Sequence, residues 1–177
     1  NLLGPLADNG GPTATIALLP GNNAIDHGNV VQGCVDESSV PLATDQRGVV
    51  RPQGVRCDIG AYEFVDTTAP IVNSITLVNP ATTNLANVGF NVTFSEPVTG
   101  VDVADFKLTN TLLTGASVTG VGGTGAGPYT VTVNTGTGNG TIRLDVLESA
   151  SIQDADGNGF GGRYTGGETY TIYKGTA

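Results

Sequence analysis

Three oxygen-bearing side chains near the C-terminus have the spacing of calcium ligands. Asp154, Asp156 and Asn158 alternate in the segment DADGNG, and Gly159 occupies the position where an acidic calcium loop turns sharply. The twelfth position of such a loop carries a bidentate Glu, but Thr165 stands there in this chain. The segment therefore predicts either a calcium site, with calcium as the cofactor, or a polar turn rich in Asp, Gly and Asn, which the missing Glu favours.

A second group of acids precedes this segment. Glu96, Asp102 and Asp105 lie within the sequence SEPVTGVDVAD. We interpret them as solvated turn residues, although the two acidic groups could approach each other at one end of a β-sandwich.

Other residues that could do chemistry are few. His27 is the only histidine and follows Asp26, but no G-x-S-x-G nucleophile motif accompanies this pair. We therefore interpret His27 as a turn residue and predict that the chain is not an enzyme. Arg47, Arg51 and Arg56 lie within ten residues, close to Asp45 and Asp58. They could bind an acidic glycan or hold their segment closed through ion pairs and bonds to carbonyls. We favour the structural role.

The two cysteines, Cys34 and Cys57, are either buried free thiols or a disulfide. A composition rich in Gly, Thr and Asn and poor in Lys favours the disulfide, and with it an oxidising extracellular setting. In the chain-entropy model, a crosslink closing a loop of this size stabilises the fold by roughly 3 kcal/mol.

Composition indicates that short strands and tight turns position these residues. The 177 residues include 27 Gly, and only 13% are charged. A net charge of −9 leaves no basic patch to neutralise phosphates, which argues against nucleic acid as a partner. No apolar run is long enough to span a bilayer, so we predict no membrane insertion. The chain lacks Met and starts at Asn1, which indicates a processed product or a fragment of a longer secreted precursor.

Residues 1–66 consist of short apolar clusters separated by Gly, Pro, Asn and Asp. The motifs LGPLADNGGPT, LLPGNNAID, TDQRGVVRP and CDIGAYEF follow one another in this region. In this order they resemble the C-terminal end of secreted bacterial parallel β-helix proteins of the "choice-of-anchor Q" type, which are related to pectin-lyase-like β-helices. The resemblance implies that residues 1–66 form the terminal coils of a right-handed parallel β-helix, or solenoid.

Two or three solenoid coils cannot bury their own apolar face, because each coil needs stacked neighbours. An open coil also exposes backbone N–H and C=O groups that another chain could pair with. Two explanations remain: the segment is the tail of a longer β-helix, or a second subunit completes its core.

Residues 67–177 predict an immunoglobulin-like β-sandwich. Val88, Phe90, Val92 and Phe94 alternate with polar residues, as expected for a half-buried strand. Strands are predicted at Ile71–Val78, Asn87–Ser95, Asp105–Thr109, Ser117–Val121, Tyr129–Thr135, Thr141–Leu147 and Thr169–Tyr173. The opening DTTAPIV and the segments NVTFSEPVTGVDVADFKLT and GETYTIYK resemble bacterial Ig-like repeats of adhesins and cell-surface proteins. That resemblance implies a spacer, stalk or adhesive module.

These features predict an all-β protein that is extracellular or on the cell surface, and three functions remain. The first is a non-enzymatic structural subunit of an extracellular fibre, sheath or surface layer, assembled through incomplete solenoid ends. The second is an adhesin or glycan-binding stalk module of a larger surface protein. The third is the tail of a β-helix enzyme acting on polysaccharide. The predicted partners are identical subunits or other repeats of the precursor, and extracellular polysaccharide.

Overall fold

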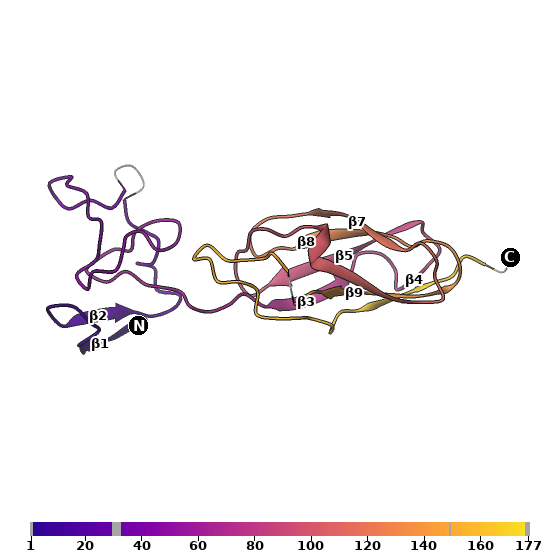
Figure 1. Ribbon diagram of the computed structural model, residues 1–177, viewed down its shortest axis with the longest axis horizontal. Coiled ribbons are helices and arrows are strands. Elements are labelled where there is room, and N and C mark those ends of the chain that lie inside the picture. The colour runs from indigo at the N-terminus through magenta and orange to yellow at the C-terminus, as the bar shows by residue number, and fades with distance from the viewer. Residues whose placement is uncertain (1, 30–32, 149, 176–177) are drawn as a thin grey trace. The chain divides into compact units, whose positions relative to one another are not determined.

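The computed structural model describes residues 2–29, 33–148 and 150–175. The fold is all-β, and the chain divides into two compact units, Asn1–Thr67 and Thr68–Ala177 (Figure 1). The boundary predicted from the sequence lies after residue 66. In the part of the chain that the model describes, no helix has the length and apolarity needed to cross a bilayer.

The second unit contains two four-stranded sheets. One sheet has the order β3-β5-β8-β7, formed by β3 (Val72–Leu77), β5 (Asn87–Phe94), β8 (Tyr129–Asn134) and β7 (Ser117–Gly122). The other has the order β4-β10-β9-β6, formed by β4 (Thr82–Thr83), β10 (Thr169–Ile172), β9 (Gly140–Val146) and β6 (Phe106–Thr111). Only the β4–β10 pair is parallel among these neighbours. This is the strand order of immunoglobulin-type sandwiches, with β4 as an additional edge strand.

Seven of these eight strands lie where the hydrophobic alternation predicts them, and β4 is the one that was not predicted. The alternation in β5 determines the face that packs inward, because Val88, Phe90, Val92 and Phe94 are all buried. The ring of Phe90 meets that of Tyr170 from β10 edge to face, with centroids 5.0 Å apart. Since these rings come from different sheets, the two sheets pack face to face around one core.

The first unit has little regular structure. Its strands β1 (Leu3–Ala7) and β2 (Thr15–Leu18) form an antiparallel pair, and isolated bridges join Val35 to Pro41 and Thr44 to Val50. The stacked parallel coils implied by the β-helix resemblance are not found among the residues described in this unit. Pro and Gly recur at short intervals after β2, and they break the chain into turns too short for parallel ladders.

The interior of the first unit is more polar than apolar. Leu18 and Cys57 are its buried hydrophobic residues in the described part, whereas its buried polar residues are Thr15, Asp45, Asp58 and Glu63. Burying carboxylates is costly unless hydrogen bonds and countercharges compensate. The contacts of these acids therefore determine how the unit holds together.

Candidate functional site

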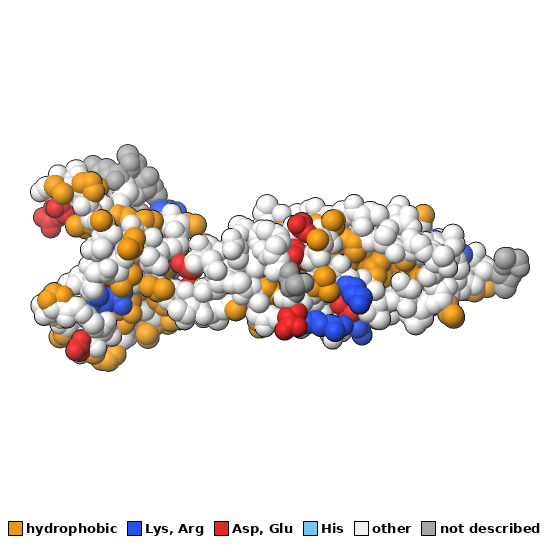
Figure 2. Space-filling model, in the orientation of Figure 1, with side chains coloured by type: hydrophobic (Ala, Val, Ile, Leu, Met, Phe, Trp, Pro, Cys, Tyr) orange, Lys and Arg blue, Asp and Glu red, His pale blue; other side chains and the backbone are white. Residues whose placement is uncertain are grey.

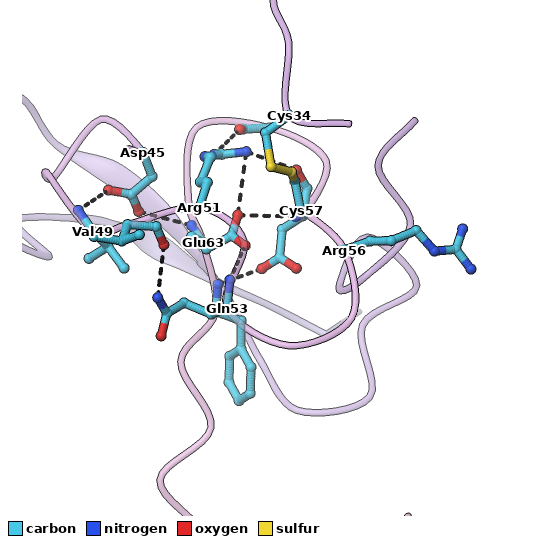
Figure 3. Close-up of polar contacts among 12 residues, drawn as sticks. Cys34, Asp45, Val49, Arg51, Gln53, Arg56, Cys57 and Glu63 are labelled. Carbon is cyan, nitrogen blue, oxygen red and sulfur yellow. Dashed lines mark hydrogen bonds and ion pairs between the residues drawn. A yellow bond between two sulfur atoms is a disulfide. The ribbon is translucent and has the colours of Figure 1, made fainter. Parts of the chain in front are cut away.

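Glu63 lies at the centre of the polar interior of the first unit, and its side chain is fully buried (Figure 3). Its Oε1 accepts the backbone N–H of Gln53 at 2.9 Å, and its Oε2 accepts that of Asp58 at 3.1 Å. Nη1 of Arg51 approaches Oε2 at 3.4 Å. One carboxylate therefore links residues 51–53, residue 58 and residue 63, which local sequence preferences alone would not hold together.

Asp45 organises the turn that precedes Glu63. Its Oδ1 accepts the backbone N–H groups of Arg47 at 2.7 Å and Val49 at 3.0 Å, while its Oδ2 accepts the backbone N–H of Glu63 at 2.9 Å. This pattern is a turn closed by an Asp side chain, which Asp adopts readily. The turn is thereby fixed to the segment that carries Glu63.

Asp58 completes the set of buried acids. It accepts the backbone N–H of Asp26 at 2.8 Å and also that of Phe64. Burial raises the pKa of Asp58, despite these two hydrogen bonds, and burial likewise raises the pKa of Glu63. Burial would also raise the pKa of Asp45, but its hydrogen bonds from Glu63, Arg47 and Val49 lower it below its ordinary value.

The arginines of this region divide into two kinds. Arg47 forms an ion pair with Asp45 and lies over the ring of Tyr62, 3.5 Å from its centroid. Arg51 donates to the backbone carbonyl of Gly60 at 2.6 Å as well as contacting Glu63. The structural role predicted for these two residues is confirmed. Arg56 is exposed, and its side chain points away from the cluster (Figure 3).

The disulfide between Cys34 and Cys57, predicted from composition, is present, with Cα atoms 5.6 Å apart. Beside it, the backbone N–H of Gly28 donates to the carbonyl of Cys57 at 2.8 Å. A Cβ at Gly28 would lie 2.6 Å from that carbonyl oxygen, so the close approach requires glycine. The crosslink therefore lies beside a point where two backbone segments of the chain are already in contact.

The central position of Glu63 was not predicted from the sequence. The sequence feature that could have indicated its burial is the acid inside CDIGAYEF, where a charged residue stands between the aromatic residues Tyr62 and Phe64. An acid in such an apolar motif is rarely buried unless it is paired. Its partners come from segments up to 18 residues away, so only the folded chain shows them.

A surface that we call the apolar face lies beside this cluster. It comprises apolar residues of β1 and β2 together with Leu2 before β1 and the loop residue Ile59. Its members are Leu2, Leu3, Leu6, Ile16, Leu18 and Ile59, all exposed except the buried Leu18. Two hollows of about 540 and 380 Å³ share Leu3, Leu18 and Ile59, so the face is continuous. No charged residue lines either hollow among the described residues, although the unit carries eight acids and three arginines. Figure 2 shows many hydrophobic side chains on the surface of this unit.

The residues predicted to bind calcium form a turn in the second unit. Asp154 is buried, and its two carboxylate oxygens each accept a hydrogen bond from Asn158, at 2.8 Å from the backbone N–H and at 2.8 Å from the side-chain amide. Asp156 is exposed. A carboxylate oxygen of Glu96 lies within 4.8 Å of one from Asp154. Calcium binding stays a prediction: the melting temperature of this unit in calcium and in EGTA tests it, and an unchanged temperature would remove the site.

Two acids of the second predicted group close a short helical turn. Asp102 accepts the backbone N–H of Ala104 at 2.7 Å, and Asp105 accepts that of Asp102 at 2.8 Å, which forms a capping box around the 3₁₀ helix η1 (Val103–Asp105). Asp102 is exposed, as predicted. The expectation that Asp105 is solvated was wrong, because it is buried and also accepts the backbone N–H of Ser151 at 2.6 Å.

His27 and Asp26 also have contacts typical of a turn. Nδ1 of His27 lies 2.6 Å from the backbone carbonyl of Ile25, and the carboxylate of Asp26 accepts the backbone N–H of Arg56 at 3.0 Å. Asp26 has a φ of 56°, in the left-handed region that Asp tolerates better than most residues. These contacts support the interpretation of His27 as a turn residue.

Comparison with known proteins adds little. No protein-family model and no curated protein sequence matches the chain. Among solved structures, the N-terminal part of the bacterial S-layer protein SbsC is similar, with 21% sequence identity and a TM-score of 0.38. The match covers 62% of this chain and 24% of that chain. At this identity and score, the similarity carries no conclusion about function.

Proposed function

We propose that this protein is a non-enzymatic structural subunit of an extracellular fibre, sheath or surface layer, and that identical subunits associate through the apolar face of the first unit. The apolar face is the observation that carries this proposal. The exposed side chains of Leu6 and Ile16 would each contribute about 1 kcal/mol or more if another molecule covered them.

The first unit needs such a partner for its own stability. A two-stranded hairpin such as β1–β2 is marginal alone in water. The polar interior holds the loops in place, but buried ion pairs with their desolvation cost contribute little net stability. Covering the apolar face would provide the hydrophobic burial that the unit lacks.

Charge restricts where two copies of this chain can meet. Each chain carries a net charge of −9, so two copies repel unless they meet through a surface without acids. The apolar face is such a surface. Pro5 lies within β1 and lacks a backbone N–H, which weakens that strand as an edge for pairing. We therefore expect the faces to pack against each other rather than the strands to extend one sheet.

The disulfide and the second unit support an extracellular location and a structural role. Disulfides persist mainly in oxidising compartments. The sandwich has a core of its own and can serve as a rigid spacer, which also favours the alternative function of an adhesin or stalk module. In that alternative, the chain presents a binding domain and does not assemble by itself.

Sedimentation velocity across micromolar concentrations, followed by electron microscopy, tests the proposal. We expect the wild-type chain to form species larger than a monomer, and Leu6→Asp to shift it toward the monomer. Leu112→Asp is the matched control, because Leu112 is an 88% exposed leucine in the second unit, compared with 68% for Leu6. A wild-type chain that stays a folded monomer at all concentrations would refute self-association.

A further inference from the structure

Positive charge in the second unit is concentrated on one side of one sheet. The unit has four basic residues, and Lys107, Arg143 and Arg163 lie on or beside the sheet β4-β10-β9-β6. Figure 2 shows a group of Lys and Arg side chains together on the visible face of this unit. The rest of the unit carries six acids and one cation, Lys174. A local excess of positive charge on an acidic protein is unusual enough to require an explanation.

Strand register places these cations around a hollow. Lys107 in β6 is paired with Asp145 in β9. On the other side of β9, Tyr164 forms a bridge with Val146, which brings its neighbour Arg163 to that edge. A hollow of about 470 Å³ lies here, lined by Lys107, Leu147, Glu148 and Arg163.

One acid beneath this site is already neutralised. The carboxylate of Asp145 is buried and accepts two hydrogen bonds from Arg143, at 2.7 and 3.1 Å, and one from the hydroxyl of Thr109 at 2.6 Å. Lys107 and Arg163 are exposed, and neither forms an ion pair with a described residue. Two cations and the exposed carboxylate of Glu148 therefore face the solvent around the hollow.

Rows of hydroxyl groups continue from this hollow across the outer face of the sheet. Residues paired across neighbouring strands point to the same side, and the core-facing residues of β9 are Ile142, Leu144 and Val146. The outer row beyond Lys107 and Asp145 contains Thr109, Arg143 and Thr169, and the next row contains Thr111, Thr141, Thr171 and Thr82. A flat surface thus combines cations at one end with hydroxyl donors and acceptors along it.

From this arrangement we infer that the outer face of β6, β9 and β10 binds an acidic polysaccharide, with a sugar carboxylate held between Lys107 and Arg163. Arginine and lysine form charge-assisted hydrogen bonds with carboxylates, and hydroxyl groups exchange hydrogen bonds with sugar hydroxyls. The half-buried Leu147 lies in the hollow and offers an apolar contact for the C–H face of a sugar ring. A polymer suits the surface because the threonine rows extend beyond the site of a single sugar.

The acidity of the whole chain does not prevent this binding. At about 0.15 M ionic strength the Debye length is about 8 Å, so distant exposed acids are largely screened. The charges in contact with the ligand therefore dominate its affinity. This inference does not depend on self-association, since it concerns the second unit.

Affinity electrophoresis of the full chain in gels containing polygalacturonate, compared with gels containing neutral dextran, tests the inference. We expect polygalacturonate to retard the wild-type chain and dextran to leave its mobility unchanged. The double variant Lys107→Gln with Arg163→Gln should bind polygalacturonate about tenfold more weakly, because it loses both charge-assisted contacts. Thermal unfolding of this variant checks that the sandwich is intact.

The double variant Arg56→Gln with Lys174→Gln is the matched control, because it removes the same charge from elsewhere on the chain. Retained binding in this control, together with lost binding in the first variant, supports the site. Equal losses in the two variants would show a general charge effect and overturn the inference. Absence of retardation of the wild-type chain by polygalacturonate, or equal retardation by dextran, would also overturn it.

Discussion

Asp58 and Glu63 secure the two ends of one loop: the carboxylate of Glu63 accepts the backbone N–H of Asp58 at 3.1 Å, while that of Asp58 accepts the backbone N–H of Phe64, the residue after Glu63. Each acid thus satisfies a backbone donor beside the other. Burial raises the pKa of both acids, and a nearby negative charge adds a smaller effect: Asp58 raises the pKa of Glu63, and Asp26 raises that of Asp58. Their closeness is tolerated because Arg51 lies beside them and backbone N–H groups point at both.

Replacing Glu63 should therefore unfold or loosen the first unit selectively. Glu63→Ala leaves the buried N–H groups of Gln53 and Asp58 without acceptors and removes the countercharge of Arg51. We expect a loss of about 3 kcal/mol or more in the free energy of unfolding of this unit. Amide hydrogen exchange of the full chain measures each unit separately. Glu37→Ala removes an exposed acid of the same unit, and an equal effect of both variants would contradict the central role of Glu63.

Removing the disulfide should also affect the first unit alone. Cys34 and Cys57 are 23 residues apart, and closing a loop of this length stabilises by about 3 kcal/mol in the chain-entropy model. We expect Cys34→Ser with Cys57→Ser to lower the protection of amides in residues 2–67 by a corresponding amount. Amides of the sandwich are the internal control, because that unit contains no cysteine. Unchanged protection in the first unit would show that its hydrogen bonds suffice without the crosslink.

The stability of the second unit should vary with pH because of Asp145. Burial would raise the pKa of Asp145, but hydrogen bonds from Arg143 and Thr109 outweigh burial and lower it below the ordinary value of 3.8. A carboxyl whose pKa is lowered by folding stabilises above its unfolded pKa, and this stability is lost as the pH falls through the folded pKa. We therefore expect the sandwich to lose stability below pH 3.8 through this group.

The variant Asp145→Asn checks the sign of this effect. It should be about 2 kcal/mol less stable than the wild type at neutral pH, since Arg143 loses its ion pair, and the difference should shrink as the pH falls below 3.8. Unfolding temperatures from pH 7 to pH 2 provide the measurement. Glu148→Gln changes an exposed acid nearby and should follow the wild-type curve. A constant difference between wild type and Asp145→Asn at every pH would contradict the assignment.

The β-sandwich could be predicted because short stretches of sequence determine its strands. In β5, Val88, Phe90, Val92 and Phe94 alternate over eight residues, and this period of two determines both the strand and its buried face. Strand β4 has two residues, Thr82 and Thr83, which is too short for any periodicity to be visible. It exists because its backbone pairs with β10, almost ninety residues later in the chain.

The first unit was less predictable because its contacts are side chain to backbone and not periodic. Composition predicted the disulfide between Cys34 and Cys57, and the disulfide is present. The burial of Glu63 depends on donors from Gln53 and Asp58, which no local pattern reveals. The basic hollow has the same origin, since Lys107 and Arg163 are far apart in the sequence. The register of β6 and β9, together with the bridge between Val146 and Tyr164, brings them to one site.

The hydroxyl of Tyr170 should be worth more to the sandwich than its small size suggests. It accepts the backbone N–H groups of Val78 at 3.0 Å and Asn79 at 2.9 Å, and it donates to the carbonyl of Gly89 at 2.7 Å. These groups belong to β5 and to the turn after β3, so one hydroxyl from β10 links the two sheets at a buried position. Tyr170→Phe removes three hydrogen bonds while keeping the ring and its contact with Phe90.

We expect Tyr170→Phe to reduce the free energy of unfolding of the sandwich by about 2 kcal/mol, because the partly buried N–H of Asn79 loses its acceptor and the buried hydrogen bond to Gly89 is lost. The N–H of Val78 keeps its hydrogen bond to the carbonyl of Gly89 at 3.1 Å. Tyr173→Phe is the matched control, since Tyr173 is 55% exposed and its change should stay within about 0.5 kcal/mol. Urea unfolding followed by circular dichroism measures both variants without relying on tyrosine emission. Equal stabilities of the two variants would mean that water or the neighbouring backbone replaces the hydroxyl, and that the ring of Tyr170 alone joins the sheets.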